Sequence, residues 1–199
     1  MTTNGTARSY TVSTPDGPFT IVTGQGGDSG DSSDNGADGG DGAGRTEYVL
    51  ASGWTAETGE LVGLIHSSLR PSRVRQCSVE EIDGLLARAV AAVRSYYGGD
   101  DNAPQDVPVL QAGGPFIEQA WSRLREIPAG TALTYTELAR LSGNPSASRA
   151  AASACARNAA ALFVPCHRIR RSDGSIGGFR YGTAVKSALL RREGAQGAE

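Results

Sequence analysis

The fold is decided by residues 134–156, which read TYTELARLSGNPSASRAAASACA. Residues 134–137 form a capping box, in which Thr is followed three positions later by Glu, so we expect a helix to begin there. This helix should end near residues 142–143, and the Asn-Pro step at 144–145 should break the chain before a second helix at about 146–156. Two short helices joined by a tight turn with Gly are typical of a helix-turn-helix, although a plain helical hairpin shares the pattern.

The second of these helices presents a smooth surface. Between Ala150 and Ala154 no side chain is long enough to reach a base edge, and only Arg149 is long. Such a face suits close approach to a phosphate backbone or a shallow minor groove without sequence readout. A helix packed in a core would also be rich in Ala, so this pattern leaves both interpretations open.

Residues upstream and downstream complete a helical C-terminal domain, predicted at 115–199. Pro115 stands at a favourable first-turn position before an apolar stripe that stops at Pro128. The preceding residues 100–114 are rich in Pro, Gly and Asp and are predicted to be a linker, with an α/β N-terminal domain at 1–99.

The N-terminal domain is predicted to contain a small antiparallel sheet and one long helix. A capping box at Ser78–Glu81 precedes apolar residues at helical spacing as far as Tyr97. A turn at Pro15–Pro18 predicts a hairpin. Four β-branched or aromatic runs predict strands: Tyr10–Ser13, Phe19–Val22, Tyr48–Ala51 and Leu61–Ile65.

Residues 24–44 consist almost wholly of Gly, Asp, Ser and Ala. Such a segment cannot bury enough apolar surface to order itself, so we expect a flexible insertion in a loop. Calcium binding is disfavoured because Asp28, Asp31 and Asp34 recur every three residues, whereas an EF-hand needs ligands at alternate positions.

Charge is segregated along the 199 residues. Residues 1–110 hold 7 Arg and 15 acidic residues, a net charge of −8, whereas residues 111–199 hold 11 Arg, one Lys and 6 acidic residues, a net charge of +6. The C-terminal half could therefore bind a polyanion, although a solvated basic face has the same composition.

The sequence predicts a cytoplasmic protein with no membrane partner. It lacks a run of 18 apolar residues and a signal-peptide pattern at its start. Cys77, Cys155 and Cys166 are an odd number at spacings that fit neither a disulfide framework nor a zinc site. Cys77 and Cys155 are predicted to be packed thiols.

Residues 164–168, Val-Pro-Cys-His-Arg, carry the clearest chemical signal. A thiol reacts as its thiolate, and a neighbouring imidazole and guanidinium favour that form. The pair follows Pro165 and the apolar run 161–164, predicted to be extended, so it would be presented from a rigid element. Most cysteines are simply buried, so Cys166 beside His167 is weak evidence by itself.

Residues 165–168 resemble the active-site signature of O6-alkylguanine-DNA alkyltransferases. Asn158, Arg149 and Tyr135 match the family's hinge asparagine, arginine finger and active-site tyrosine. Further matches lie in the substrate-pocket loop and the closing helix, which correspond to residues 172–175, 177–179 and 185–193.

The resemblance implies an α/β N-terminal domain of ribonuclease H-like type followed by the helix-turn-helix domain. It also implies DNA repair by irreversible transfer of an alkyl group from O6-alkylguanine, and from O4-alkylthymine as a further substrate, to Cys166, once per molecule. The expected partner is double-stranded DNA with such a lesion, and the protein is expected to be a monomer without a cofactor or metal.

The resemblance also implies roles for individual residues. Glu193 would orient His167, which would take the proton of Cys166 through a water. Tyr135 would donate a proton to guanine N3, Arg149 would fill the gap left by the flipped nucleotide, and Asn158 would tie the recognition helix to the active-site segment. Further DNA contacts are expected from Ser146, Ala150 and Arg157, and the substrate pocket is expected to contain Val164, Pro165, Ile169, Phe179, Arg180 and Tyr181.

Some features depart from the family pattern and leave rivals. The acidic insertion is unusual, and Cys77 and His66 are too few for the zinc site of some members. Tyr181 is predicted to narrow the pocket against bulky adducts. A lesion-binding protein of the same fold is disfavoured because its cysteine is commonly replaced by Trp, and a Cys-His hydrolase would not explain Arg149 or the helix-turn-helix.

Overall fold

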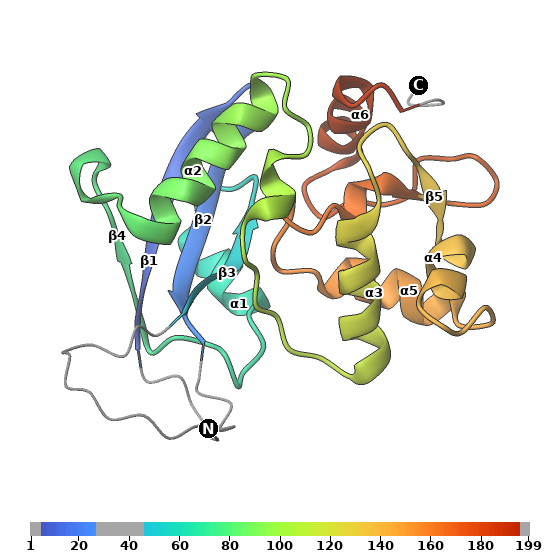
Figure 1. Cartoon of the computed structure of the whole chain (residues 1–199), viewed down its shortest axis with the longest axis horizontal. Coiled ribbons are helices and arrows are strands. Elements are labelled where there is room, and N and C mark those ends of the chain that lie inside the picture. Colours follow the sequence, from blue (N-terminus) through green and yellow to red (C-terminus); the bar gives the residue numbers. More distant parts are fainter. Residues whose placement is uncertain (1–4, 27–45, 196–199) are drawn as a thin grey trace, which may run out of the picture.

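The computed structural model describes residues 5–26 and 46–195. A sheet and its helices form the N-terminal region, and a group of helices forms the C-terminal region beside it (Figure 1). The predicted insertion lies mostly outside the described residues. Its first two residues, Gly24 and Gln25, belong instead to a strand, since both pair with the neighbouring strand.

The sheet has the strand order β3-β2-β1-β4. The first three strands are antiparallel, as predicted, but β4 pairs in parallel with β1, so the sheet is mixed. We did not predict β4, because its sequence RVRQ has no apolar run and lies on an edge where its side chains are mostly exposed. The strands are β1 (Thr6–Thr14), β2 (Gly17–Gln25), β3 (Glu47–Gly53) and β4 (Arg73–Gln76).

The fourth predicted strand, Leu61–Ile65, is wrong. This segment lies in and just after the helix α1 (Thr58–Leu64). Leu61 and Ile65 are both buried one helical turn apart, in the core cluster that contains Val22. A short apolar run fits a strand and a helix equally well in sequence, and packing against the sheet decides between them.

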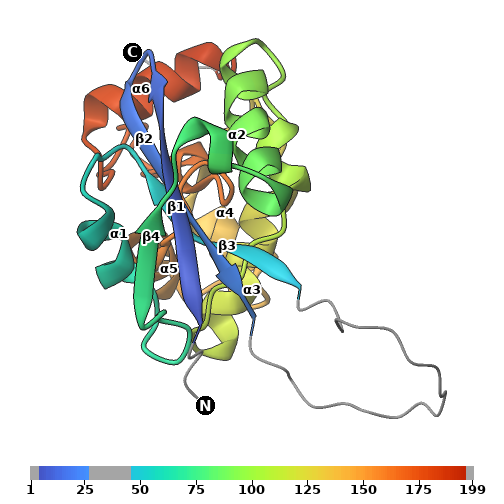
Figure 2. The same ribbon diagram turned by 90° about the vertical axis from the view of Figure 1, so that its left-hand side faces the viewer.

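The long N-terminal helix begins later than predicted. The capping box at Ser78–Glu81 is present, but it caps a single 3-10 turn, and α2 starts at Gly84 and runs to Tyr97. Residues 82–83 are extended, so they separate the two helices. Helices α1 and α2 cover opposite faces of the sheet (Figure 2). Adjacent residues of β2 point to opposite faces, so Ile21 packs in the same core cluster as α2 and Val22 in the same cluster as Leu61 of α1.

Residues 100–114 pack against the N-terminal sheet. The segment contains a 3-10 turn, η2 (Ala103–Asp106), and its later part runs beside β3. Val49 N donates to Pro108 O at 2.9 Å, and Leu110 N donates to Val49 O at 3.0 Å. One continuous core then joins residues of the sheet, α2 and the C-terminal helices. The predicted domain boundaries themselves stay a prediction.

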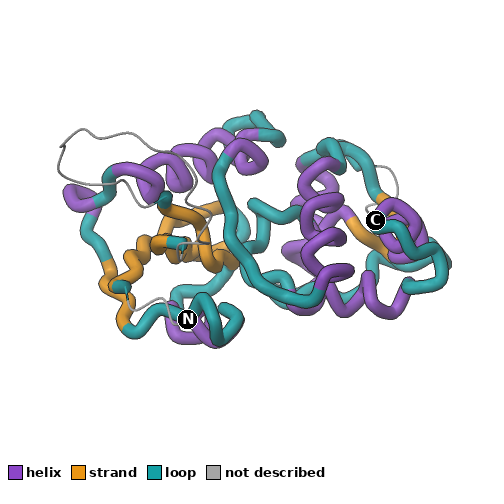
Figure 3. The backbone as a smooth tube through the Cα atoms, turned by 60° about the horizontal axis from the view of Figure 1, so that its bottom comes forward, coloured by secondary structure: helices purple, strands orange, loops and turns teal. Residues whose placement is uncertain are grey.

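The C-terminal region is mainly helical (Figure 3). The capping box of α4 is confirmed: Glu137 N donates to Thr134 Oγ1 at 3.2 Å, and Thr134 N donates to the Glu137 carboxylate at 2.6 Å. Gly143 has a φ of 84° in the turn that leads from α4 to α5, a conformation that favours Gly. The helices are α3 (Pro115–Glu126), α4 (Tyr135–Leu141), α5 (Ser148–Arg157) and α6 (Thr183–Arg192), and two short parallel strands, β5 (Leu133–Thr134) and β6 (Ile169–Arg170), join the region.

The predicted extended run at 161–164 is a buried turn. Val164 N donates to Ala160 O at 2.8 Å, and Leu162 has a φ of 72°, the left-handed region. The apolar residues of this run are buried, as their sequence indicates, but they are not extended. Ala160 pairs with Ser52 of β3, and the chain must reverse its direction directly afterwards. Within the residues that the structure describes, no helix is long and apolar enough to cross a membrane.

Candidate active site

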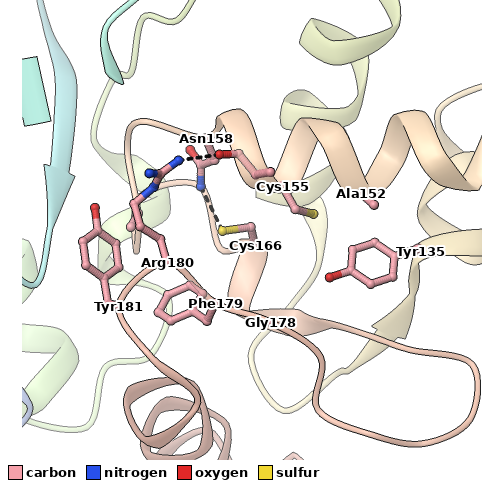
Figure 4. Close-up of a pocket in the computed structure, with 11 residues that line it drawn as sticks. Tyr135, Ala152, Cys155, Asn158, Cys166, Gly178, Phe179, Arg180 and Tyr181 are labelled. Carbon is pink, nitrogen blue, oxygen red and sulfur yellow. Dashed lines mark hydrogen bonds between the residues drawn. The ribbon is translucent and has the colours of Figure 1, made fainter. Parts of the chain in front are cut away.

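Cys166 begins a 3-10 turn, η3 (Cys166–Arg168), directly after the buried turn. Its side chain is buried, and its Sγ accepts a hydrogen bond from Asn158 Nδ2 at 3.1 Å (Figure 4). Asn158 is held on both sides of its amide, because Nδ2 also donates to Val164 O at 2.8 Å and Oδ1 accepts from Ala160 N at 3.1 Å. The end of α5 therefore positions one N–H donor on the sulfur.

The protonation of Cys166 is set by opposing effects. Burial raises the pKa of the Cys166 thiol, whereas the hydrogen bond from Asn158 and the charges of Lys186 and Arg180 favour the thiolate. Burial has the larger effect, so the resting side chain is a thiol. A base must remove the proton before the sulfur can act as a strong nucleophile.

The neighbouring His167 belongs to a buried ionic cluster around Glu193. The Glu193 carboxylate accepts hydrogen bonds from His167 Nε2 at 2.8 Å, Tyr96 Oη at 3.0 Å and Arg168 Nε at 2.8 Å. Arg168 is also satisfied by two main-chain carbonyls, those of Ile127 at 2.6 Å and Asp101 at 3.2 Å. All the charges in this cluster are paired, as burial requires.

The cluster fixes the charge state of both Glu193 and His167. Burial alone would raise the pKa of Glu193, but the hydrogen bonds and charges of His167 and Arg168 hold it at about 2. Burial lowers the pKa of His167, although Glu193 favours the protonated form. The resting pair is therefore a carboxylate and a neutral imidazole.

The same geometry selects the tautomer of His167. Because a carboxylate can only accept, Nε2 must carry the hydrogen, and Nδ1 then has a free lone pair. Among the described residues, this buried Nδ1 has no hydrogen-bond partner. His167 can therefore accept a proton at Nδ1 while Glu193 stabilises the resulting imidazolium.

Cys166 opens onto a cavity of about 470 Å³ between α5 and the loop before α6. Tyr135 and Tyr181 lie on opposite sides of Cys166 along this cavity (Figure 4). Burial raises the pKa of Tyr135, so its hydroxyl stays protonated at neutral pH and can donate a hydrogen bond. The lining residues are Tyr135, Ala152, Cys155, Ala156, Asn158, Ala161, Cys166, Gly178, Phe179, Arg180 and Tyr181.

Comparisons with known proteins agree with this site. Residues 115–195 match the family model described as "6-O-methylguanine DNA methyltransferase, DNA binding domain". The chain is 31% identical over 141 residues to a methylated-DNA--protein-cysteine methyltransferase of Shigella flexneri, covering 71% of this chain and 80% of that protein. The chain belongs to the O6-methylguanine DNA methyltransferase family.

Other members of the family extend the comparison. A methylated-DNA--protein-cysteine methyltransferase of Methanosarcina acetivorans is 37% identical over 57% of this chain and 72% of its own length. The bifunctional transcriptional activator/DNA repair enzyme Ada of Escherichia coli is 46% identical over 46% of this chain, but the match spans only 26% of Ada. The crystal structure of the Mycobacterium tuberculosis O6-methylguanine methyltransferase has a TM-score of 0.63 and 25% identity, covering 94% of this chain and 93% of that one.

The residues that the family resemblance predicted are only partly gathered at the cavity. Phe179, Arg180 and Tyr181 line it, together with the predicted catalytic residues Tyr135, Asn158 and Cys166. In contrast, Val164, Pro165 and Ile169 are buried behind the site and are not among its lining residues.

Several residues near the site were not predicted from the sequence. Ala152, Cys155 and Ala156 line the cavity from one face of α5, at a helical spacing of three and four that could have revealed them. Ala161 also lines it, and so does Gly178, which belongs to the segment 177–179 that resembles the substrate-pocket loop. Tyr96 and Arg168 bind Glu193, and Lys186 is buried and donates to Ile169 O; no local pattern predicts these long-range contacts.

The predicted DNA contacts lie along α5 and around its start. Arg149 is exposed and lines a shallow cavity with Tyr135 and Arg171. Ser146 is exposed before the helix and Ala150 is half-buried in it, whereas Arg157 is exposed at its far end, about 12 Å along the axis from Arg149. Within the described ranges, no group of His, Cys, Asp and Glu could hold a metal ion.

Proposed function

We propose that this protein repairs DNA by transferring an alkyl group from O6-alkylguanine to Cys166, irreversibly and once per molecule. The observation that carries the proposal is the placement of Cys166 at a cavity, where Asn158 donates a hydrogen bond to its sulfur. The next residue in the sequence, His167, is buried and paired with Glu193. O4-alkylthymine is included as a further substrate. The alternative, a lesion-binding protein, has no specific observation in its favour here.

The nucleophile is activated by proton transfer to His167. The neutral imidazole has its lone pair on Nδ1, and Glu193 remains a carboxylate because its pKa is about 2. The Cys166 proton passes through a water to Nδ1, and Glu193 stabilises the imidazolium through Nε2. Asn158 Nδ2 stabilises the charge that develops on the sulfur.

In the transfer step, a bond forms between Sγ and the alkyl carbon as the bond between that carbon and O6 breaks. The electron pair of the broken bond stays on the guanine, which takes up one proton at N3 and leaves neutral. The proton that Cys166 gave to His167 then passes through solvent to replace the proton donated to the guanine, so that overall the thiol loses one proton and the guanine gains one. We assign the donation at guanine N3 to Tyr135. The product is a thioether that no acid-base group of this site can cleave, so the protein is consumed.

DNA is the substrate that the charge distribution supports. The C-terminal residues 111–199 carry a net charge of +6, and Arg149 is exposed at the α5 face that borders the site. Because O6 lies inside a duplex, the damaged nucleotide must be flipped into the cavity, which costs a few kcal/mol. We propose that Arg149 enters the stack, while Ser146, Ala150 and Arg157 contact the backbone.

Several finer features remain part of the proposal. The N-terminal domain is taken as ribonuclease H-like, the protein as a monomer, and the compartment as the cytoplasm, where its three unpaired cysteines would stay reduced. Val164, Pro165 and Ile169 would shape the pocket from behind Cys166 rather than touch the base.

The test is mass spectrometry of the intact protein and of its peptides after incubation with a duplex that contains O6-methylguanine. We expect a stoichiometric gain of one methyl group on Cys166, with no gain in Cys166→Ser. A duplex with unmodified guanine is the substrate control. If the wild-type protein binds the lesion duplex but gains no mass, the lesion-binding alternative replaces the transfer reaction.

A further inference from the structure

Tyr181 lines the cavity, yet its side chain is anchored on the N-terminal sheet. Its hydroxyl donates to Ser52 O in β3 at 3.2 Å. The next residue of β3, Gly53, lies so close that an ideal Cβ built on it would be 1.8 Å from Tyr181 Oη and 2.0 Å from Cζ. The ring therefore occupies space that any residue other than Gly at position 53 would fill.

Aromatic neighbours hold the same ring from the sides. Trp54, which follows β3, packs edge-to-face on Tyr181 with centroids 5.5 Å apart, and Phe179 packs on Tyr181 at 5.6 Å. Trp54 is itself fixed, because the ring centroids of Phe19 and Trp54 are 4.8 Å apart and Trp54 Nε1 donates to Tyr97 Oη at 2.9 Å. Such contacts restrict the ring beyond simple burial.

This arrangement makes one wall of the cavity rigid. Tyr135 lies on the other side of Cys166, so an alkyl group that extends from O6 toward Tyr181 meets a ring that cannot retreat into the sheet (Figure 4). A mobile side chain would yield to a larger group, whereas a ring braced by backbone must exclude it.

We propose that strand β3 sets the size limit for the transferred alkyl group, with Ser52, Gly53 and Trp54 acting as positioning residues for Tyr181. The N-terminal domain thus takes part in substrate selection without touching the reacting atoms. This inference rests on the proposed alkyl transfer to Cys166. It assigns to Gly53 the task of leaving room for the ring of Tyr181.

The first test compares transfer rates from O6-methylguanine and O6-benzylguanine in the same duplex. In the wild-type protein the benzyl group should react more slowly than the methyl group. Tyr181→Ala should raise the benzyl-to-methyl rate ratio by roughly tenfold or more, the range that apolar pockets reach when they discriminate by size. Tyr181→Phe keeps the ring and should retain most of the discrimination.

The second test asks whether Gly53 acts through Tyr181. Gly53→Ala places a methyl group where the ring of Tyr181 stands, so the ring must move away from β3 and the wall that it forms in the cavity must move with it. We expect methyl transfer to fall roughly tenfold. In the Tyr181→Ala background the same substitution should have no effect, because no ring remains to be displaced. Gly59→Ala is the matched control, since nothing lies within 4 Å of its Cβ position.

The outcomes separate the two proposals. An unchanged rate ratio in Tyr181→Ala overturns the size limit, even when methyl transfer to Cys166 proceeds normally. An equal loss from Gly53→Ala in both backgrounds shows that Gly53 acts without Tyr181 and also overturns the inference. If wild-type protein accepts no alkyl group from either lesion, the proposed function fails, and the inference fails with it. Thermal melting of each variant distinguishes unfolding from a change in the site.

Discussion

The N-terminal and C-terminal regions use their buried polar groups differently. In the sheet, buried polar side chains such as Thr20 and Ser52 bond to the main chain, donating to Thr55 O at 2.6 Å and to Ala161 O at 2.8 Å. The C-terminal region instead buries charges, with Arg168 and Glu193 paired at 2.8 Å and His167 beside them. Buried charges cost stability unless they are paired, and this paired cluster lies in the region to which we assign the chemistry.

Two tyrosine hydroxyls, one from each region, donate hydrogen bonds to the other region. Tyr96 of α2 donates to Glu193, and Tyr181 of the pocket loop donates to Ser52 of β3. The N-terminal region therefore supplies support for the site rather than reactive groups.

Glu193→Gln should have the largest effect. The substitution keeps the shape but removes the charge that pairs with Arg168, and breaking a buried pair costs about 3–5 kcal/mol of unfolding free energy. Alkyl transfer should fall roughly 10²-fold or more, because the imidazolium loses its counter-charge. Urea unfolding and single-turnover transfer measure the two effects. Glu126→Gln, on an exposed ion pair with Arg123, is the matched control and should change neither.

Stability should fall as pH decreases, in two stages. The pKa of His167 is lowered from 6.5, and that of Glu193 is lowered from 4.5 to about 2. For each of the two groups the pKa in the folded protein is lower than in the unfolded chain, so the unfolded chain binds more protons at acidic pH. The stabilisation from each group is therefore complete above its pKa in the unfolded chain and is lost as the pH falls toward its pKa in the folded protein. For Glu193 the loss is on the order of 3 kcal/mol between pH 4.5 and 2.

Denaturant midpoints measured at several pH values check this dependence. Glu193→Gln should lack the lower stage, because it has no carboxyl group to protonate. A stability that is level from pH 7 to pH 3 in the wild-type protein would contradict the assigned charge states.

Tyr96→Phe, a change in the N-terminal region, should have a moderate effect on the buried charges of the C-terminal region. It removes one of the donors to Glu193, at a cost of about 1 kcal/mol. The carboxylate then attracts the imidazolium more strongly, so the pKa of His167 rises, and the acidic limb of the transfer-rate profile should move to higher pH. Tyr97→Phe is the control for the pH of this limb, because its hydroxyl bonds Trp54 and Asp16 instead of Glu193; it can change the rate through Tyr181 but should leave the pKa of His167 unchanged. Equal profiles for both variants would show that Tyr96 only fills space.

Arg149→Ala should have the smallest effect on stability and act through the interaction with DNA. Because Arg149 is exposed and has no ion pair among the described residues, unfolding should change by less than about 0.5 kcal/mol. If Arg149 enters the stack as proposed, its loss should weaken binding of the lesion duplex and slow alkyl transfer, and the removal of one positive charge should lower the salt slope of duplex affinity by at most about one unit. Arg88→Ala, exposed on α2, removes the same charge from the other region, and an equal loss of affinity there would argue against a specific role of Arg149.

Local sequence determined the parts of this protein that depend on neighbours along the chain. Residues 134–137 specify the start of α4 because a capping box is formed within one turn. The turn between α4 and α5 and the segment around Cys166 follow from similarly short motifs. The same local logic misplaced Leu61–Ile65 and extended the α2 pattern back to Ser78, since an apolar pattern does not say which surface it will pack against.

Only the tertiary structure decided the contacts between distant segments. The donation from Tyr96 to Glu193 joins residues 97 positions apart, and that from Tyr181 to Ser52 joins residues 129 apart. Strand β4 formed from a polar sequence because β1 offered it an unpaired edge. Burial and pairing at such distances depend on how the layers pack. Cys166 could therefore be singled out as the candidate nucleophile from a short motif and its family resemblance, whereas the protonation state and the walls of its site required the fold.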